Sequence, residues 1–175
     1  MIDFPRSSSG RNAIDIAMEA AGYAGTILLR RFSESKNIKI KGRGNVVTET
    51  DLEVEAAVKE ILKKEYPEIP ILAEESGGHL SNEGWLWIID PLDGTRNFAS
   101  NIPHFATVIA LAHNGEVQLG ITHDPIRNET FHSLKGLGAF LNGQGISVSV
   151  EERLADGILG LDLSYDDQGG AYSLD

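Results

Sequence analysis

The chain contains no cysteine in its 175 residues, so a disulfide framework and a thiolate metal site are both excluded. It also lacks any apolar run long enough to span a bilayer, and we expect no membrane partner. Basic residues are few: 15 lysines and arginines stand against 26 aspartates and glutamates, a net charge of −11. A nucleic-acid partner requires a basic face against its phosphates, so this composition predicts no nucleic-acid partner.

The first residues lack the basic stretch and following apolar stretch of a secretory signal peptide, so we expect a cytoplasmic protein. The length is sufficient for one domain with a substantial core. The excess of negative charge makes the chain a poor host for an anionic substrate, unless bound cations reverse the local field. An anionic substrate would therefore require a metal site.

The chain is organised around an apolar run, Leu86–Ile89, that leads without a polar break into Asp90. Such a run is typical of a strand covered on both faces, and it is too short for a helix. A carboxylate at the end of a buried strand needs a partner, because an unpaired buried charge destabilises the fold. Pro91 fixes φ and has no N–H, so we expect the strand to stop at Asp90.

The residues that follow predict oxygen ligands beside a phosphate site. Asp90 and Asp93 lie three positions apart with the carbonyl of Leu92 between them, and such oxygens suit Mg²⁺. Gly94 and Thr95 are a turn and a helix start, whose free N–H groups suit a phosphate. The alternative is a common Asp-Pro turn, in which the two carboxylates only cap the next helix.

A second acidic pair, Glu74 and Glu75, directly follows the short apolar strand predicted at 71–73. Two acidic clusters that each end a short strand favour a shared cation over an isolated turn. The segments Glu74–Ser76 and Trp87–Phe98 (WIIDPLDGTRNF) together resemble the signature of the inositol monophosphatase family. The match is ungapped within each segment and chemically specific.

The resemblance implies a Mg²⁺-dependent phosphoric monoester hydrolase that acts on a small phosphorylated metabolite, of the inositol-phosphate or sugar-phosphate type. It implies two or three Mg²⁺ ions per site, for which Mn²⁺ can substitute. Glu74, Asp90 and the Leu92 carbonyl would hold the first ion, and Asp90 with Asp93 the second. In this arrangement a metal-activated water attacks the phosphate.

The resemblance also implies a catalytic set of Asp51, Thr95 and Glu74, with the N–H groups of Gly94 and Thr95 on the phosphate. Residues 46–51 are similar to the family segment whose aspartate helps a threonine to orient the attacking water. Position alone gives Asp51 a second interpretation, as an acidic residue in the first turn of a helix. We expect the functional role, given the other motifs.

The predicted fold class is α+β, with two long helices packed on a largely antiparallel sheet. Apolar stripes at helical spacing predict helices over 11–33 and from Thr50 to about Tyr66. Alternating strands follow, with a hairpin turn at Asn114–Gly115 and further strands at 146–150 and 155–163. The arrangement resembles the first domain of the family, and we assign 1–154 to it. Residues 155–175 would open a second α/β domain.

Members of the family continue through that second domain, which supplies a further aspartate within a Trp-Asp motif. No tryptophan follows Trp87 in this chain, so the motif is missing. The alternative function is therefore a catalytically impaired or non-catalytic metal-binding domain. A haloacid-dehalogenase-type phosphatase is a further alternative, but its Asp-x-Asp-Gly-Thr motif has closer carboxylates and no residue like Pro91. We expect the chain to self-associate, as a homodimer.

Overall fold

The computed structural model describes residues 4–34, 38–40, 46–79 and 81–158. The helices are α1 (Ala13–Phe32), α2 (Glu49–Glu65) and α3 (Thr95–Ala99). One sheet holds β3 (Ile71–Ala73), β4 (Trp85–Asp93), β5 (Ala106–His113), β6 (Glu116–Asp124), β7 (Glu129–Leu134), β8 (Gly138–Leu141) and β9 (Gln144–Ile146). A separate pair consists of β1 (Ile38–Ile40) and β2 (Val46–Thr48).

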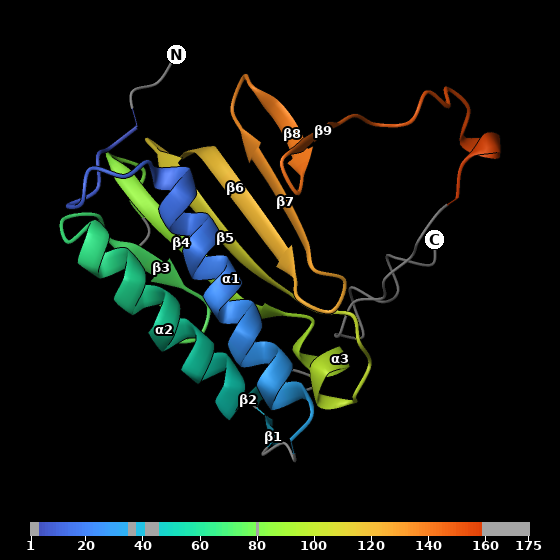
Figure 1. Cartoon of the computed structure of the whole chain (residues 1–175), viewed down its shortest axis with the longest axis horizontal. Coiled ribbons are helices and arrows are strands. Elements are labelled where there is room, and N and C mark those ends of the chain that lie inside the picture. The colour runs from blue at the N-terminus through green and yellow to red at the C-terminus, as the bar shows by residue number, and fades with distance from the viewer. Residues whose placement is uncertain (1–3, 35–37, 41–45, 80, 159–175) are drawn as a thin grey trace.

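The seven strands are arranged in chain order from β3 to β9, and α1 and α2 lie side by side on one face of the sheet (Figure 1). Every neighbouring pair is antiparallel except β3 and β4, which are parallel. The α+β class with two long helices on a largely antiparallel sheet is thus confirmed. In the described part of the chain, no helix has both the length and the hydrophobicity needed to cross a bilayer.

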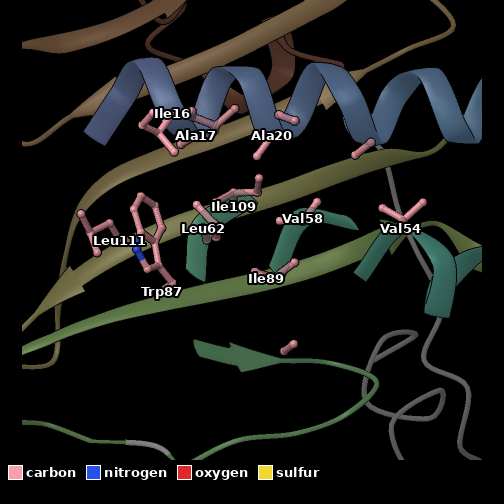
Figure 2. Close-up of a cluster of buried hydrophobic side chains, with 14 of the residues drawn as sticks. Ile16, Ala17, Ala20, Val54, Val58, Leu62, Trp87, Ile89, Ile109 and Leu111 are labelled. Atoms are coloured by element: carbon pink, nitrogen blue, oxygen red, sulfur yellow. The ribbon is translucent and has the colours of Figure 1, made fainter. Parts of the chain in front are cut away.

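The core lies between the two helices and β4, β5 and β6. Figure 2 shows Ile16, Ala17 and Ala20 of α1 opposite the side chains of β4 and β5. Small residues on α1 permit a close approach to the sheet. A Cβ added to Gly25 would lie 2.4 Å from Nε2 of His123 on β6, so a larger residue there would push α1 off the sheet. Gly25 is therefore one position at which the close packing of α1 on β6 depends on a small residue.

The start of α2, which carries Asp51, is tied to the end of α1. Glu53 accepts a hydrogen bond of 2.7 Å from Nε of Arg31, and a second ion pair to the same carboxylate comes from Arg30. Such partly exposed pairs contribute little free energy but fix the relative position of two helix ends. They hold the first turn of α2 near the C-terminal end of β4.

Several element boundaries differ from the sequence-based expectations. The turn at Asn114–Gly115 forms as expected, with positive φ at both residues. The strand expected at 146–150 is wrong beyond its first residue, because β9 ends at Ile146 and the next four residues have no partner strand. The strand expected at 155–163 is replaced in part by a short 3₁₀ turn at Leu154–Asp156, and residues 159–163 lie outside the described residues. Apolar alternation forms a strand only where a partner is available.

Candidate active site

The end of β4 is shaped by an interruption at Pro91. The strand continues to Asp93 with a register shift against β5 between Asp90 and Asp93, so the expectation that it stops at Asp90 is wrong. Pro91 cannot donate to the ladder, but its carbonyl accepts a 2.9 Å hydrogen bond from Oγ1 of fully buried Thr107. Asp90 Oδ1 accepts a 3.1 Å hydrogen bond from the N–H of Leu92. The bulge is therefore held by a side chain of β5 and by the side chain of Asp90 itself.

The residue after the bulge must be glycine for two reasons. Gly94 has φ of 87°, in the left-handed region that side chains disfavour. A Cβ there would also lie 2.9 Å from the backbone oxygen of His104. This turn directs the chain into α3, which is only five residues long. The helix start expected at Thr95 is present, although so short a helix has a weak dipole.

Thr95 lies between two oxygen atoms from different parts of the chain. Its hydroxyl oxygen is 3.1 Å from Oδ1 of Asp51 and 2.9 Å from the carbonyl oxygen of Leu92. The one hydroxyl hydrogen can be given fully to only one of these acceptors at a time. Asp51 is only 1% exposed and lies in the first turn of α2, 44 residues away in sequence. The structure thus brings Asp51 and Thr95 together.

Glu74 follows β3 in a tight turn beside the end of β4. Its N–H donates a 3.1 Å hydrogen bond to the carbonyl of Ile89, which extends the parallel pairing by one residue. Ala73 and Gly77 close the turn through a reciprocal pair of backbone hydrogen bonds of 3.1 and 2.9 Å. The Glu74 side chain is exposed. Parallel pairing of β3 and β4 therefore places Glu74 near Asp90.

The pKa of Asp90 is raised by its burial and by the neighbouring carboxylates. Burial, and next the negative charge of Glu74, raise the pKa of Asp90 from 3.8 to about 7. A hydrogen bond to Glu74 and the charge of Asp93 contribute smaller parts of this rise, while the hydrogen bond from the N–H of Leu92 opposes it. The part of this shift that comes from repulsion between carboxylates is the part that a divalent cation would relieve directly.

Across the described residues, no three carboxylate or histidine side chains converge closely enough to hold a metal ion. Glu74 and Asp90 interact directly, whereas the side chain of Asp93 is exposed at the end of the bulge. The third oxygen expected for the first ion is a backbone carbonyl, that of Leu92, which now accepts a hydrogen bond from Thr95. The structure thus brings together the carboxylates of Glu74 and Asp90, and it places the Leu92 carbonyl against the Thr95 hydroxyl.

An open cleft of about 390 Å³ adjoins the end of β4. Its walls come from the turn before α3, from β5 and from the ends of β6 and β7. The lining residues are Asp93, Gly94, Asn97, His104, Phe105, Ala106, Thr122, Asp124 and Phe131. Its volume is within the range of small-molecule sites, and it is lined by Gly94, one of the two residues whose N–H groups are expected to bind phosphate.

Two residues at this site were not predicted from the sequence. Thr107 holds the Pro91 carbonyl, and buried Glu55 on α2 accepts hydrogen bonds from the turn after Glu74. Glu55 has a signal in the sequence, because it follows Asp51 by four residues and so lies on the same face of a helix. Thr107 has none, since a threonine in a strand is ordinary.

The sequence model described as "Inositol monophosphatase family" matches residues 11–172 of the chain. The chain belongs to the inositol monophosphatase family. Within it, the inositol monophosphatase of Dictyostelium discoideum is 38% identical over 170 residues, 94% of this chain and 61% of that protein. The Nus factor SuhB of Escherichia coli is 36% identical over 149 residues, 83% of this chain and 56% of that protein.

Solved structures of the family share the fold. The suhB protein of Bartonella henselae gives a TM-score of 0.86 at 33% identity, covering 91% of this chain and 63% of that one. An IMPase/NADP phosphatase, crystallised with NADP and Ca²⁺, gives 0.67 at 26% identity, covering 74% of this chain and 50% of that one. The present chain thus spans between 50% and 63% of the length of these family members.

Proposed function

We propose that the chain carries the metal- and phosphate-binding part of a Mg²⁺-dependent phosphoric monoester hydrolase. Its substrate is a small phosphorylated metabolite, of the inositol-phosphate or sugar-phosphate type. The observation that carries the proposal is the position of the Thr95 hydroxyl, between buried Asp51 and the Leu92 carbonyl, at the end of the strand that also holds Asp90. A turn that only capped the next helix would not need a buried carboxylate from α2.

The donor atoms at the site fit hard divalent cations. Glu74, Asp90 and the Leu92 carbonyl are the proposed ligands of the first ion, and Asp90 and Asp93 of the second. Oxygen donors of this kind select Mg²⁺ or Mn²⁺, and two or three ions are proposed per site. The raised pKa of Asp90 supports this assignment, because an ion near Asp90 and Glu74 would offset their repulsion.

Each proposed catalytic residue has a distinct role. Bound divalent ions would supply the Lewis acidity that activates water and balances the charge on the phosphate. Asp51 accepts the hydroxyl hydrogen of Thr95, so the lone pairs of Thr95 can accept a hydrogen bond from the attacking water and orient it. Glu74 completes the catalytic set beside the water. The N–H groups of Gly94 and Thr95 donate to phosphate oxygens and stabilise the charge that develops on them.

The test is phosphate release from four substrates by the purified protein, with millimolar Mg²⁺ or with a chelator. The panel is an inositol phosphate, fructose bisphosphate, histidinol phosphate and a 3′,5′-nucleotide bisphosphate. We expect turnover of at least one substrate, its loss with chelator and in Asp90→Asn, and its retention in Asp15→Asn. Asp15 is exposed on the first turn of α1, remote from the end of β4 (Figure 1). Turnover that withstands the chelator would refute the proposal.

The second candidate is a non-catalytic metal-binding domain that self-associates as a homodimer. Relatives of similar identity are named Nus factor SuhB, a name that does not refer to phosphate esters. Calorimetric Mn²⁺ binding without turnover of any of the four substrates would support this function. Sedimentation of the metal-bound protein as a monomer would exclude the homodimer.

A further inference from the structure

The carboxylate of Glu55 is buried at the junction between α2 and the turn that carries Glu74. The residue is 4% exposed, and its Oε2 accepts hydrogen bonds of 2.9 Å from the N–H of Glu75 and 3.3 Å from that of Ser76. Its other oxygen lies 3.5 Å from Nζ of Lys59. A buried charge is tolerated only with such partners, so the junction is specifically arranged.

The turn after β3 is held by its own backbone hydrogen bonds, by β4 and by α2. Among the described strands, the three-residue β3 lies at the edge of the sheet and pairs with β4. Beyond Glu74, the N–H groups of Glu75 and Ser76 point to Glu55, and Ser76 Oγ accepts a 2.6 Å hydrogen bond from Nζ of Lys59. The turn is thus attached to α2 through both its backbone and a side chain.

One face of α2 therefore supports two parts of the site. Asp51 and Glu55 lie four residues apart, so their side chains project from the same side of the helix, one turn apart. Asp51 contacts the hydroxyl of Thr95, and Glu55 contacts the turn that presents Glu74. Two segments, 20 and 44 residues away in sequence from the α2 residues that they contact, are thus fixed relative to the same helix.

We propose that Glu55 is a positioning residue, whose carboxylate fixes the Glu74 turn so that Glu74 can share a divalent cation with Asp90. The inference rests on the proposed function. Side chains that orient metal ligands contribute about 10- to 100-fold to metal affinity in other proteins. The length of the Glu55 side chain is the property that matters, because it places one oxygen atom within hydrogen-bond distance of two N–H groups. Its negative charge, which Lys59 offsets, is secondary.

Three substitutions separate the effect of side-chain length from the effect of charge. Glu55→Gln keeps the length and one acceptor oxygen but removes the charge; Glu55→Asp keeps the charge and shortens the side chain; Glu55→Ala removes both. The matched control is Glu60→Ala, which removes an exposed carboxylate from the same helix. The readouts are the Mn²⁺ dissociation constant from calorimetry, the melting temperature without metal, and kcat as a function of Mg²⁺ concentration.

We expect Glu55→Gln to bind Mn²⁺ within about threefold of the unsubstituted protein, and Glu55→Asp and Glu55→Ala to bind it at least ~10-fold more weakly. Saturating Mg²⁺ should restore most of kcat in Glu55→Asp, which a simple loss of folded protein would not allow. If Glu55→Ala does not fold, the comparison of Gln with Asp decides. Unchanged Mn²⁺ affinity in the folded Asp and Ala variants would overturn the proposal, as would weak binding by Gln with normal binding by Asp.

The outcome also distinguishes this proposal from the proposed function. If the unsubstituted protein does not bind Mn²⁺, the metal site itself is wrong and Glu55 has no ligand to position. If Asp90→Asn abolishes binding while every Glu55 variant binds normally, the metal site stands and only the positioning role is refuted. In the second case, the Glu60→Ala control must bind Mn²⁺ as tightly as the unsubstituted protein does.

Discussion

Replacement of Asp90 by asparagine should stabilise the metal-free protein and abolish its response to Mg²⁺. Asp90 lies at the bulge of β4, where burial and the charge of Glu74 raise its pKa to about 7. Asparagine has nearly the same shape and can still accept the hydrogen bond from the N–H of Leu92. The substitution therefore removes a charge and leaves most of the local geometry unchanged.

The size of the effect follows from the pKa. Each unit of pKa shift corresponds to about 1.4 kcal/mol, so a shift from 3.8 to about 7 sets an upper limit of about 4 kcal/mol on the cost of ionising Asp90. Solvent at the edge of the bulge screens part of this, and we expect Asp90→Asn to raise the free energy of unfolding by ~1–2 kcal/mol at pH 8. Because its pKa is raised in the folded state, Asp90 binds its proton more tightly in the folded protein than in the unfolded chain. The stability that this gives is fully present below pH 3.8 and is lost as the pH rises through about 7. The difference should therefore be small at pH 5.

The assay is urea unfolding at pH 5 and pH 8, with and without Mg²⁺, together with phosphate release. Asp90→Asn should unfold at higher urea than the unsubstituted protein at pH 8 without metal, and Mg²⁺ should no longer shift its midpoint. Asp15→Asn is the control for removal of an exposed aspartate. Equal stability at pH 8 and unchanged phosphate release in Asp90→Asn would refute both the electrostatic argument and the metal assignment.

Four further outcomes are expected. Mg²⁺ or Mn²⁺ at about 100 times its dissociation constant should stabilise the protein by about 2.7 kcal/mol, and a thermal scan without any shift would contradict this. Thr95→Ala should lower kcat by ~100-fold while Thr95→Ser retains most of it; equal loss in both would exclude a role for the hydroxyl. Gly94→Ala should destabilise the fold by ~1–3 kcal/mol, because its φ is 87° and a Cβ would meet the backbone at 2.9 Å. Gly22→Ala, in α1, should instead raise the free energy of unfolding by ~0.5–1 kcal/mol in the same urea assay, because the added Cβ would meet no atom outside its own helix within 4 Å.

The pH dependence of metal binding has a sign opposite to that of metal-free stability. An ion binds the ionised form of Asp90, so its affinity should fall by up to about tenfold for each pH unit below the pKa of about 7. Calorimetric titration with Mn²⁺ from pH 5.5 to 8 measures this. Affinity that does not change across this range would mean that Asp90 is not a ligand.

The sequence by itself determined the local elements and the types of donor atom. Helical stripes place α1 and α2 within two residues of their observed ends, and an Asn-Gly pair fixes a hairpin, because these patterns report interactions between residues close in sequence. It also supplied carboxylates directly after two short strands, at Glu74 and Asp90. The association of Asp51 with Thr95 came only from the resemblance to a family, since spacing equally allowed a helix cap.

Only the tertiary structure decided which of these groups meet. The continuation of β4 through Pro91 depends on a hydroxyl from Thr107, 16 residues away, and local rules that end a strand before proline cannot include that partner. The same holds for Glu55, because its contact with the turn after Glu74 depends on the edge position of β3 and on the packing of α2 against the sheet. Contacts of this kind depend on how the helices and strands pack, and periodicity along one segment carries no information about the segment that will lie beside it.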